Sequence, residues 1–400
     1  MGKLTSLRMV ALVLAVMICF GCTACAEQIV IPDFHLNVEH EIPDNEAMRF
    51  VRDMRLGWNL GNTFDAYDDS GYVKNHMDIE TFWCGTKTTP EAIAALHDAG
   101  FNTLRIPVSW HNHVDENFQI DKEWLDRVAE VADYALAHDM YVIINIHHDT
   151  DRNFYYPDEE HYEQSEKYII AIWTQVAARF ADYDDHVIFE CINEPRLRDT
   201  SLEWHVDVNK EESVSSVLQI SRLNQVFVDT VRSAGGNNAT RYLMVPGYAA
   251  SVAGVTNEHF TMPVDTVENR IIISVHAYTP YSFALDAGGT NEFDPANINF
   301  SQEIPLFMES LYEKYVAQGI PVIIGEFGSR DKRGNLQDRV DHAAYFVYHA
   351  TARGMLCCWW DNHAFKGNGE LFGILDRKNA TFAYPEIVEA MVKFAPPKAE

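Results

Sequence analysis

Short apolar runs alternate with amphipathic segments along most of the chain. Each run is rich in Val and Ile and is apolar at consecutive positions, which predicts strands buried on both faces, as in a parallel sheet covered by helices. The eight predicted strands cover residues 55–60, 102–107, 141–147, 187–193, 241–246, 271–278, 321–326 and 355–361.

Segments with helical spacing lie between these strands. Thr89 can cap a helix that has Pro90 at its first position and ends at Gly100, and Asp121 can cap the next helix. Further helices are predicted over residues 163–180, 211–233, 302–318, 337–353 and 385–394. Only the link between the fifth and sixth strands lacks a clear helical pattern.

This alternation predicts a single α/β domain, a (β/α)8 TIM barrel, with enlarged loops after several strands. An open dinucleotide-binding sheet would need a Gly-x-Gly-x-x-Gly turn after the first strand, and the sequence has none there. We place the barrel domain at residues 46–395, after a polar leader at 27–45.

The first 26 residues predict an export signal. Lys3 and Arg8 precede a twelve-residue apolar run at 9–20, and Ala-Cys-Ala at 24–26 has the form of a cleavage site. Twelve residues cannot span a bilayer as a helix, which needs about 20. The protein is therefore expected to be secreted, with lipid anchoring at the cell surface through Cys22 or Cys25 as the alternative.

The net charge limits the classes of partner that the chain can bind. The chain has 31 Lys and Arg against 59 Asp and Glu, a net charge of −28. Such a field repels nucleic acid, anionic lipid surfaces and polyanionic polysaccharides, whereas a neutral polymer is compatible with it.

The four cysteines beyond the signal, at 84, 191, 357 and 358, have no zinc-type spacing and predict buried thiols. A monomer is expected.

Polar residues gather at the carboxyl ends of seven predicted strands, which meet at one mouth of such a barrel. Two of them are acids, Glu194 after the fourth strand and Glu326 after the seventh. A pair of carboxyl groups flanking a glycosidic bond can protonate the leaving oxygen and attack the anomeric carbon. The alternative is that each acid forms a structural ion pair with a nearby arginine.

Seven motifs in order make the chain similar to glycoside hydrolase family 5, the cellulase family. They are Gly-Trp-Asn-Leu-Gly-Asn-Thr at 57–63, Arg-Ile-Pro-Val-Ser-Trp at 105–110, Asn-Ile-His-His at 145–148, Ile-Asn-Glu-Pro at 192–195, His-Ala-Tyr at 276–278, Ile-Gly-Glu-Phe-Gly at 324–328 and Trp-Trp-Asp-Asn at 359–362. The first motif, with Glu-Thr-Phe-Trp at 80–83, resembles the broad endoglucanase and xyloglucanase branch of the family.

The resemblance implies a secreted, retaining endo-β-1,4-glucanase that works by double displacement without a cofactor. Glu194 matches the general acid/base and Glu326 the nucleophile. Arg105 matches an arginine beside the nucleophile, which would keep Glu326 ionised. Reduced solvation and the negative charge of Glu326 would help Glu194 to hold its proton. A retaining mechanism places the two carboxyl groups about 5–5.5 Å apart.

The resemblance also implies residues that support the chemistry. Asn193 would bind the sugar 2-hydroxyl, His147 and His276 would line the catalytic subsite, and the hydroxyl of Tyr278 would contact the nucleophile. Trp360 would form a platform for a sugar ring. Any one of these polar groups could instead be a satisfied buried residue.

The sequence leaves alternative roles open for residues further from the two acids. Because neighbouring strand residues face opposite ways, either Trp359 or Trp360 could point into the mouth, and we predict Trp360. His111 is a candidate subsite residue. Trp83 and Trp204 could extend the cleft, whereas tryptophans inside apolar strands belong to the core.

Three alternatives remain. A mannanase or xylanase could use the same scaffold in place of a glucanase acting on cellulose-type, mixed-linkage or xyloglucan chains. A metal-dependent barrel hydrolase could use His111 with His113 or the His-His-Asp run at 147–149. A non-catalytic glycan-binding relative would lack one of the two acids, and both are present here.

Overall fold

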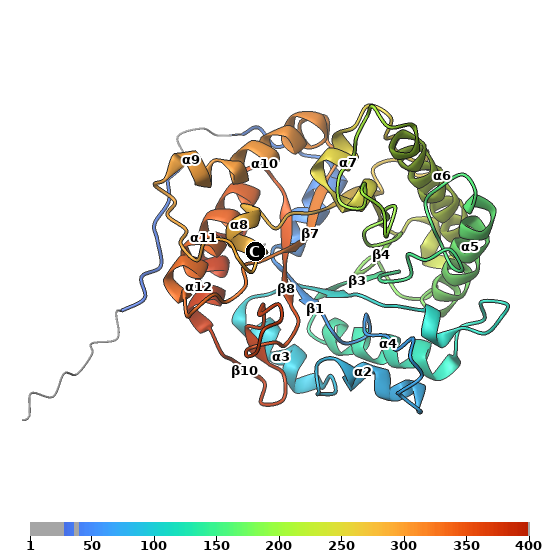
Figure 1. The fold of residues 1–400 in the computed structure, drawn as a ribbon, viewed down its shortest axis with the longest axis horizontal. Helices are drawn as coiled ribbons and strands as arrows, with labels where there is room; N and C mark the ends of the chain where they lie inside the picture. Colours follow the sequence, from blue (N-terminus) through green and yellow to red (C-terminus); the bar gives the residue numbers. More distant parts are fainter. Residues whose placement is uncertain (1–27, 36–39, 399–400) are drawn as a thin grey trace, which may run out of the picture.

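The computed structural model describes residues 28–35 and 40–398 and contains a closed barrel of eight parallel strands surrounded by helices (Figure 1). The strands are β1 Gly57–Leu60, β2 Thr103–Ile106, β3 Tyr141–Asn145, β4 Val187–Glu190, β5 Leu243–Pro246, β6 Ile271–His276, β7 Val322–Phe327 and β8 Leu356–Asp361. They pair in sequence order, and β8 closes the barrel by pairing in parallel with β1. The predicted fold class is confirmed.

Four of the eight strands end earlier than the sequence predicts. β4 ends at Glu190, although the apolar pattern runs on through Cys191 and Ile192, because these two residues are buried in the loop that follows. β7 ends one residue later than predicted, at Phe327. Glu194 therefore belongs to a loop, whereas Glu326 belongs to a strand.

The helices follow the predicted segments closely. They are α1 Glu46–Met54, α2 Ile79–Phe82, α3 Pro90–Ala99, α4 Lys122–Leu136, α5 Tyr162–Arg179, α6 Glu211–Ser233, α7 Val252–Thr256, α8 Tyr281–Ala284, α9 Ile298–Ser301, α10 Glu303–Lys314, α11 Leu336–Ala352 and α12 Pro385–Phe394. The side chain of Thr89 accepts a hydrogen bond from the backbone of Ala92, and Gly100 ends α3 in the left-handed conformation, at φ 106°. The link between β5 and β6 holds only the short α7.

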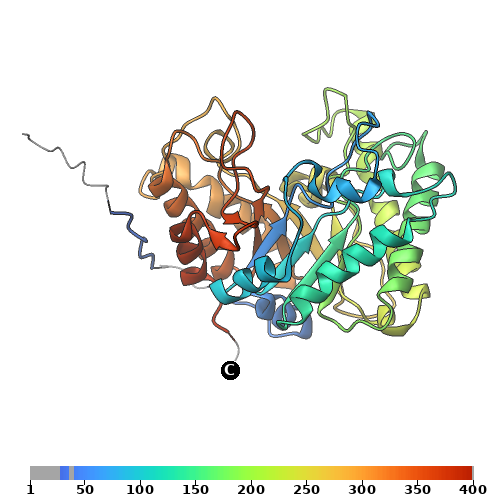
Figure 2. The same ribbon diagram turned by 90° about the horizontal axis from the view of Figure 1, so that it is seen from below.

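Helix α1 was not predicted, and it closes the amino-terminal end of the barrel. Its buried residues Ala47, Val51 and Met54 form one hydrophobic cluster with residues from six strands. Figure 2 shows this blue helix below the strands, on the side opposite the long loops. The barrel is thus open to a ligand only at the carboxyl ends of its strands.

The segment predicted as a polar leader packs against the barrel domain where it is described. Phe34 contacts the rings of Tyr345 and Phe394, from α11 and α12. The backbone N–H of Val30 donates to the side chain of Gln337, whose amide donates back to the Val30 carbonyl. The predicted export signal, with Cys22 and Cys25, lies outside the described residues.

The remaining described features agree with the expected globular core. Cys84 is half-buried, Cys191, Cys357 and Cys358 are buried, and all four are free thiols. A two-stranded hairpin, β9 Leu375–Asp376 and β10 Thr381–Phe382, follows β8. Within residues 28–35 and 40–398, no helix is long and apolar enough to cross a membrane.

Candidate active site

A cleft of about 820 Å³ lies at the carboxyl ends of the barrel strands. Seven residues predicted from the sequence line it: His147, Asn193, Glu194, His276, Tyr278, Glu326 and Trp360. The eighth, Arg105, is fully buried in the cleft floor and donates to Glu326 and Asn193. The barrel therefore brings together side chains from six different strands and their loops.

The two acids face each other in this cleft. One oxygen atom of Glu194 and one of Glu326 lie within 4.8 Å of each other and of a ring nitrogen of His276. The side chain of Glu326 is 6% exposed and that of Glu194 is 17% exposed. This separation leaves no room for a water molecule to sit between a sugar carbon and the second carboxylate, as inverting glycosidases require.

Arg105 is the cation beneath the acids. Its guanidinium donates to Glu326 Oε1 at 2.9 Å, to Glu190 Oε2 at 2.8 Å and to Asn193 Oδ1 at 2.8 Å. It also donates to Asn59 Oδ1 at 2.8 Å. Burial disfavours the charged guanidinium, but the charges of Glu190 and Glu326 outweigh burial and raise the pKa of Arg105.

Glu190 is a site residue that the sequence analysis missed. It lies within β4, is fully buried, and accepts hydrogen bonds from Arg105, from Asn145 Nδ2 at 3.0 Å and from the Ser274 hydroxyl. The signal was a single acid inside the apolar run Val-Ile-Phe-Glu. A buried acid requires a cationic or hydrogen-bonding partner, so this pattern could have predicted a pairing with Arg105.

Glu326 is held in place from several sides. The hydroxyl of Tyr278 donates to its Oε2 at 2.8 Å, while Arg105 holds its Oε1. The ring nitrogen Nε2 of His147 lies 4.0 Å from Oε1, and Nδ1 of His276 lies 3.6 Å from it. Burial and the charge of Glu326 raise the pKa of Tyr278 well above 10, so its hydroxyl is a donor at all ordinary pH values.

The pKa values of the two acids are ordered opposite to the sequence-based expectation. Burial, together with the charge of Glu194, raises the pKa of Glu326 despite the cations His276 and Arg105. Burial alone would also raise the pKa of Glu194. A 2.8 Å hydrogen bond to His276 and the charge of that residue outweigh burial, so the pKa of Glu194 is lowered. Both acids in turn raise the pKa of His276. Groups this close titrate together as one cluster.

Trp360 lines the cleft and Trp359 lies in the core. The indole plane of Trp360 is parallel to the His147 ring, at 1° and 5.8 Å between centroids. The indole N–H of Trp359 donates to the Phe372 carbonyl. Gly61 allows the Trp360 ring to lie where it does, because a Cβ at position 61 would be 2.8 Å from that ring.

Aromatic and charged residues extend the cleft beyond the acids. Trp83 is 37% exposed and Trp204 is 59% exposed, and both line the cleft, whereas Trp58 and Trp110 are fully buried. Asn62 of the first motif also lines the cleft. Further lining residues that the sequence analysis did not single out are Ala249, Ser251, Tyr281, Leu285, Asp286, Ala287, Arg330 and Glu370. Most of these come from the long loops that follow β5 to β8, and their direction is set by tertiary packing.

His111, the candidate subsite residue, lies beside the main cleft and does not line it. It lines a smaller side pocket of about 160 Å³, and His148 lines both spaces. Nδ1 of His111 lies 2.6 Å from Asp149 Oδ1, and Nε2 lies 3.4 Å from Asp69. The buried Asp149 carboxylate therefore fixes the orientation of the ring.

The His-x-His pair does not converge on a metal. His113 stacks on Trp124 at 3.6 Å and 8°, while His111 binds Asp149. Two other groups in the described part of the chain bring three possible ligand atoms within 4.8 Å. They are Asp65 with His147 and His148, and Glu194 with His276 and Glu326. In the second group hydrogen bonds already engage the acids, so the geometry favours acid–base chemistry there.

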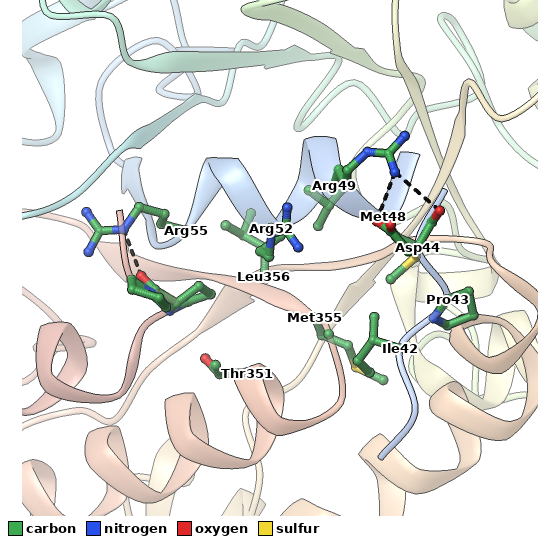
Figure 3. Close-up of a pocket in the computed structure, with 14 residues that line it drawn as sticks. Ile42, Pro43, Asp44, Met48, Arg49, Arg52, Arg55, Thr351, Met355 and Leu356 are labelled. Carbon is green, nitrogen blue, oxygen red and sulfur yellow. Dashed lines mark hydrogen bonds and ion pairs between the residues drawn. The ribbon is translucent and has the colours of Figure 1, made fainter. Parts of the chain in front are cut away.

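A second pocket, of about 350 Å³, lies at the opposite end of the barrel (Figure 3). Helix α1 and the turn between α11 and β8 line it, with Arg49, Arg52 and Arg55 along one side. Its one acid, Asp44, is paired with Arg49 at 2.9 Å. No pair of acids faces this space, so the cleft at the other end is the candidate active site.

Comparison with known proteins decides the family. The model of the cellulase family (glycosyl hydrolase family 5) matches residues 67–366, three quarters of the chain. The chain belongs to glycosyl hydrolase family 5. It is therefore a glycoside hydrolase, and the resemblance carried by its motifs is confirmed.

Similar family 5 proteins cover nearly the whole chain. Endoglucanase B of Ruminococcus albus is 41% identical over 378 residues, 94% of this chain and 87% of that protein. A family 5 lichenase from Caldicellulosiruptor sp. F32, solved with cellotetraose as a variant, is 55% identical with a TM-score of 0.91, covering 92% of this chain and all of that one. A broad-specificity endoglucanase of subfamily 4 from Ruminococcus champanellensis, with bound cellotriose, is 40% identical with a TM-score of 0.81, covering 88% of this chain and all of that one.

Proposed function

We propose that this family 5 enzyme is a retaining endo-β-1,4-glucanase in which Glu326 is the nucleophile and Glu194 the general acid/base. The observation that carries the proposal is the pair of facing carboxylates within 4.8 Å, of which only Glu326 is bound by both a buried arginine and a tyrosine hydroxyl. A nucleophile needs a fixed, ionised carboxylate, and these two donors stabilise that form.

The reaction proceeds in two displacements. First, an oxygen of Glu326 forms a bond to the anomeric carbon while the glycosidic C–O bond breaks and Glu194 gives its proton to the leaving oxygen. Then Glu194 takes a proton from water, the water oxygen attacks the same carbon, and the ester bond to Glu326 breaks. The anomeric configuration is retained because it is inverted twice.

Glu194 needs a proton for the first step. Nδ1 of His276 lies 2.8 Å from Glu194 Oε1, so a proton held between them can move onto Glu194 as the leaving oxygen approaches. The negative charge of Glu326 favours keeping a proton in this cluster. The Michaelis complex therefore has His276 as the reservoir beside the acid.

Neighbouring residues orient the sugar. The side-chain oxygen of Asn193 accepts from Arg105, which leaves its amide N–H groups to donate to the 2-hydroxyl. Trp360 presents a ring beside His147 at the cleft floor, where the apolar face of a pyranose can stack. Both contacts hold the ring that receives the nucleophile.

Internal bonds of a neutral β-glucan are the proposed substrate. Indoles that line the cleft come from three separate places, the loop after β1 with Trp83, the loop after β4 with Trp204, and β8 with Trp360. Several platforms around one pair of acids fit several consecutive sugars of a chain. The similar proteins named as endoglucanases and a lichenase support a β-1,4-linked glucan over a mannan or xylan.

Two variants test the catalytic roles. Glu326→Ala and Glu194→Ala should each reduce kcat on mixed-linkage glucan by at least about 10⁴-fold and leave the unfolding midpoint near that of the wild type. Azide should restore turnover of an activated aryl cellobioside, giving a β-glycosyl azide with Glu194→Ala and an α-glycosyl azide with Glu326→Ala. Glu309→Gln, at an ion pair outside the cleft, is the control. Near-wild-type rates in either alanine variant would disprove the assignment.

A substrate panel tests the specificity. We expect turnover of carboxymethylcellulose, lichenan or xyloglucan to exceed that of glucomannan and xylan. Faster cleavage of mannan or xylan would replace the glucanase proposal with the corresponding activity on the same two acids.

Export and oligomeric state are proposed on the sequence alone. We propose that the signal at 1–26 is removed and that the enzyme is secreted as a monomer. Mass spectrometry of the exported protein distinguishes cleavage after residue 26 from lipid attachment at Cys22 or Cys25. Light scattering that gives twice the chain mass would contradict the monomer.

A further inference from the structure

Arg196 lies two residues after Glu194 and contacts three parts of the same side of the cleft. Its NH1 donates to the Glu194 backbone carbonyl at 2.9 Å and lies 3.8 Å from Glu194 Oε2. Its Nε donates to Glu203 at 3.2 Å. Its guanidinium carbon lies 4.0 Å from the centroid of the Trp204 ring. One planar cation thus joins the acid to an exposed indole.

Trp204 is a prominent exposed indole of the cleft. It is 59% exposed although the Arg196 guanidinium covers one of its faces, so the exposed area belongs to the other face and the ring edge. A planar guanidinium stacked on an indole restricts the ring to one orientation. The free face is then fixed for stacking on a sugar ring.

The loop that carries Trp204 is anchored in the residues that precede the indole. The Tyr248 hydroxyl donates to the Leu202 carbonyl and accepts from the Leu197 backbone N–H, each at 2.9 Å. The carboxylate of Glu203 accepts from the Asp199 backbone N–H at 3.2 Å. The stacked pair therefore sits on a braced loop.

We propose that Arg196 is a positioning residue that couples a sugar platform, Trp204, on the leaving-group side of the cleft to the proton affinity of Glu194. This inference rests on the proposed role of Glu194 as the acid/base. Trp204 belongs to the leaving-group side because the acid must face the leaving oxygen, and the indole is held against the same loop as that acid.

The charge of Arg196 acts on the acid directly. The charged and titratable groups that face Glu194 are His276 from β6, His148 after β3, Glu326 from β7 and Arg196. Arg196 and the two histidines favour the ionised form of Glu194. Removing the guanidinium charge should therefore raise the proton affinity of the Glu194–His276 pair and free the indole in the same change.

The first test measures the pH dependence of kcat/KM for cellohexaose. Arg196→Gln should move the alkaline limb, which reports deprotonation of the Glu194–His276 pair, to higher pH by about one unit. Arg196→Lys keeps the charge and should keep the limb within about 0.3 unit. The matched control is Arg222→Gln, since Arg222 also stacks on a ring, that of Tyr162, and pairs with a glutamate, but outside the cleft.

The second test separates the platform from the acid. Trp204→Ala and Arg196→Gln should each lower kcat/KM for cellohexaose by about 5- to 10-fold, mainly through KM for Trp204→Ala. The double variant should lose clearly less than the product of the two losses, because both remove one shared contact. With 2,4-dinitrophenyl β-cellobioside, whose leaving group needs no acid and no further sugars, both variants should stay within about 2-fold of the wild type.

The outcomes distinguish this inference from the proposed function. An unshifted alkaline limb in Arg196→Gln, or fully multiplicative losses in the double variant, overturns the coupling while leaving Glu194 as the acid. Equal losses of Arg196→Gln on the aryl cellobioside and on cellohexaose reduce Arg196 to a structural residue and also overturn it. If instead Glu194→Ala keeps its activity on cellohexaose, the proposed function itself fails.

Discussion

Glu190→Gln tests whether the buried acid of β4 holds Arg105 for the chemistry. Glutamine keeps the shape, and its amide can donate to the Ser274 hydroxyl while its oxygen still accepts from Arg105 and Asn145. The change therefore removes one negative charge from a fully buried group and leaves Glu326 as the one carboxylate bound to the guanidinium.

We expect Glu190→Gln to lower the folding stability of the protein. Breaking a buried ion pair costs about 3–5 kcal/mol, and we expect about 3 kcal/mol because Glu326 still compensates part of the Arg105 charge. With an unfolding entropy of about 2.1 cal/mol/K per residue over about 370 residues, this lowers the unfolding temperature by about 4 °C. Glu309→Gln, which breaks a partly exposed pair with Arg353, should cost less than about 1 kcal/mol.

The activity should change through Glu326. Arg105, freed from Glu190, interacts more strongly with Glu326, lowers the pKa of that carboxyl and weakens it as a nucleophile. The acidic limb of kcat/KM should move to lower pH, and kcat should fall by about 10-fold or more. Urea unfolding followed by tryptophan fluorescence and a pH series on lichenan measure both effects. A variant with wild-type stability and an unmoved acidic limb would refute the reasoning.

Four further predictions follow from the cleft and the core. Tyr278→Phe removes a hydrogen bond that favours ionised Glu326, so kcat should fall by about 10- to 100-fold and the acidic limb should move to higher pH, as a pH series would show. Trp360→Ala should raise KM for cello-oligosaccharides by about 10-fold in steady-state assays and, because the indole is buried, should also lower the unfolding midpoint by about 5 °C. Dialysis against EDTA should leave activity on lichenan within about 20% of the starting value; its loss, restored by a divalent ion, would revive the metal-dependent alternative. Burial lowers the pKa of His113 to about 3, so below pH 6.5 the unfolded chain binds a proton that the folded chain does not bind. This residue should therefore reduce the free energy of unfolding by about 1.4 kcal/mol per pH unit between pH 6.5 and pH 3. His113→Phe keeps the stacking on Trp124 and should flatten that slope in urea titrations.

The barrel and its pair of acids could be predicted because both follow from short-range patterns. A strand covered on both faces is apolar at consecutive positions, and polar residues that end such strands meet at one mouth. Helix α1 was missed although its pattern is also local, since Asn45 caps it and its buried residues Ala47, Val51 and Met54 recur at helical spacing. Its place under the barrel could not be predicted, because these residues pack against residues of six strands that lie far along the chain.

The sequence could not predict the directions of single side chains either, because each direction is set by a partner far along the chain. The ring of His111 follows Asp149, 38 residues away, and that of His276 follows Glu194, 82 residues away. The motifs predicted Glu326 as a partner of Arg105, but no pattern indicated that a histidine would bind the other acid. That contact is the main interaction that lowers the pKa of Glu194, and the charges of Arg196 and His148 add to it.

The surroundings of the two acids differ in a way that supports their proposed roles. Glu326 belongs to β7 and is 6% exposed, and its two oxygens are bound by Arg105 and Tyr278, so the carboxylate is fixed where a bond to carbon must form. Glu194 belongs to a loop and is 17% exposed, and its partner His276 can itself carry a proton. A group that gives and takes protons must reach solvent water once in each cycle, whereas a nucleophile must exclude it. Exchanging the roles would place the proton donor where Arg105 opposes protonation and the nucleophile where water can compete.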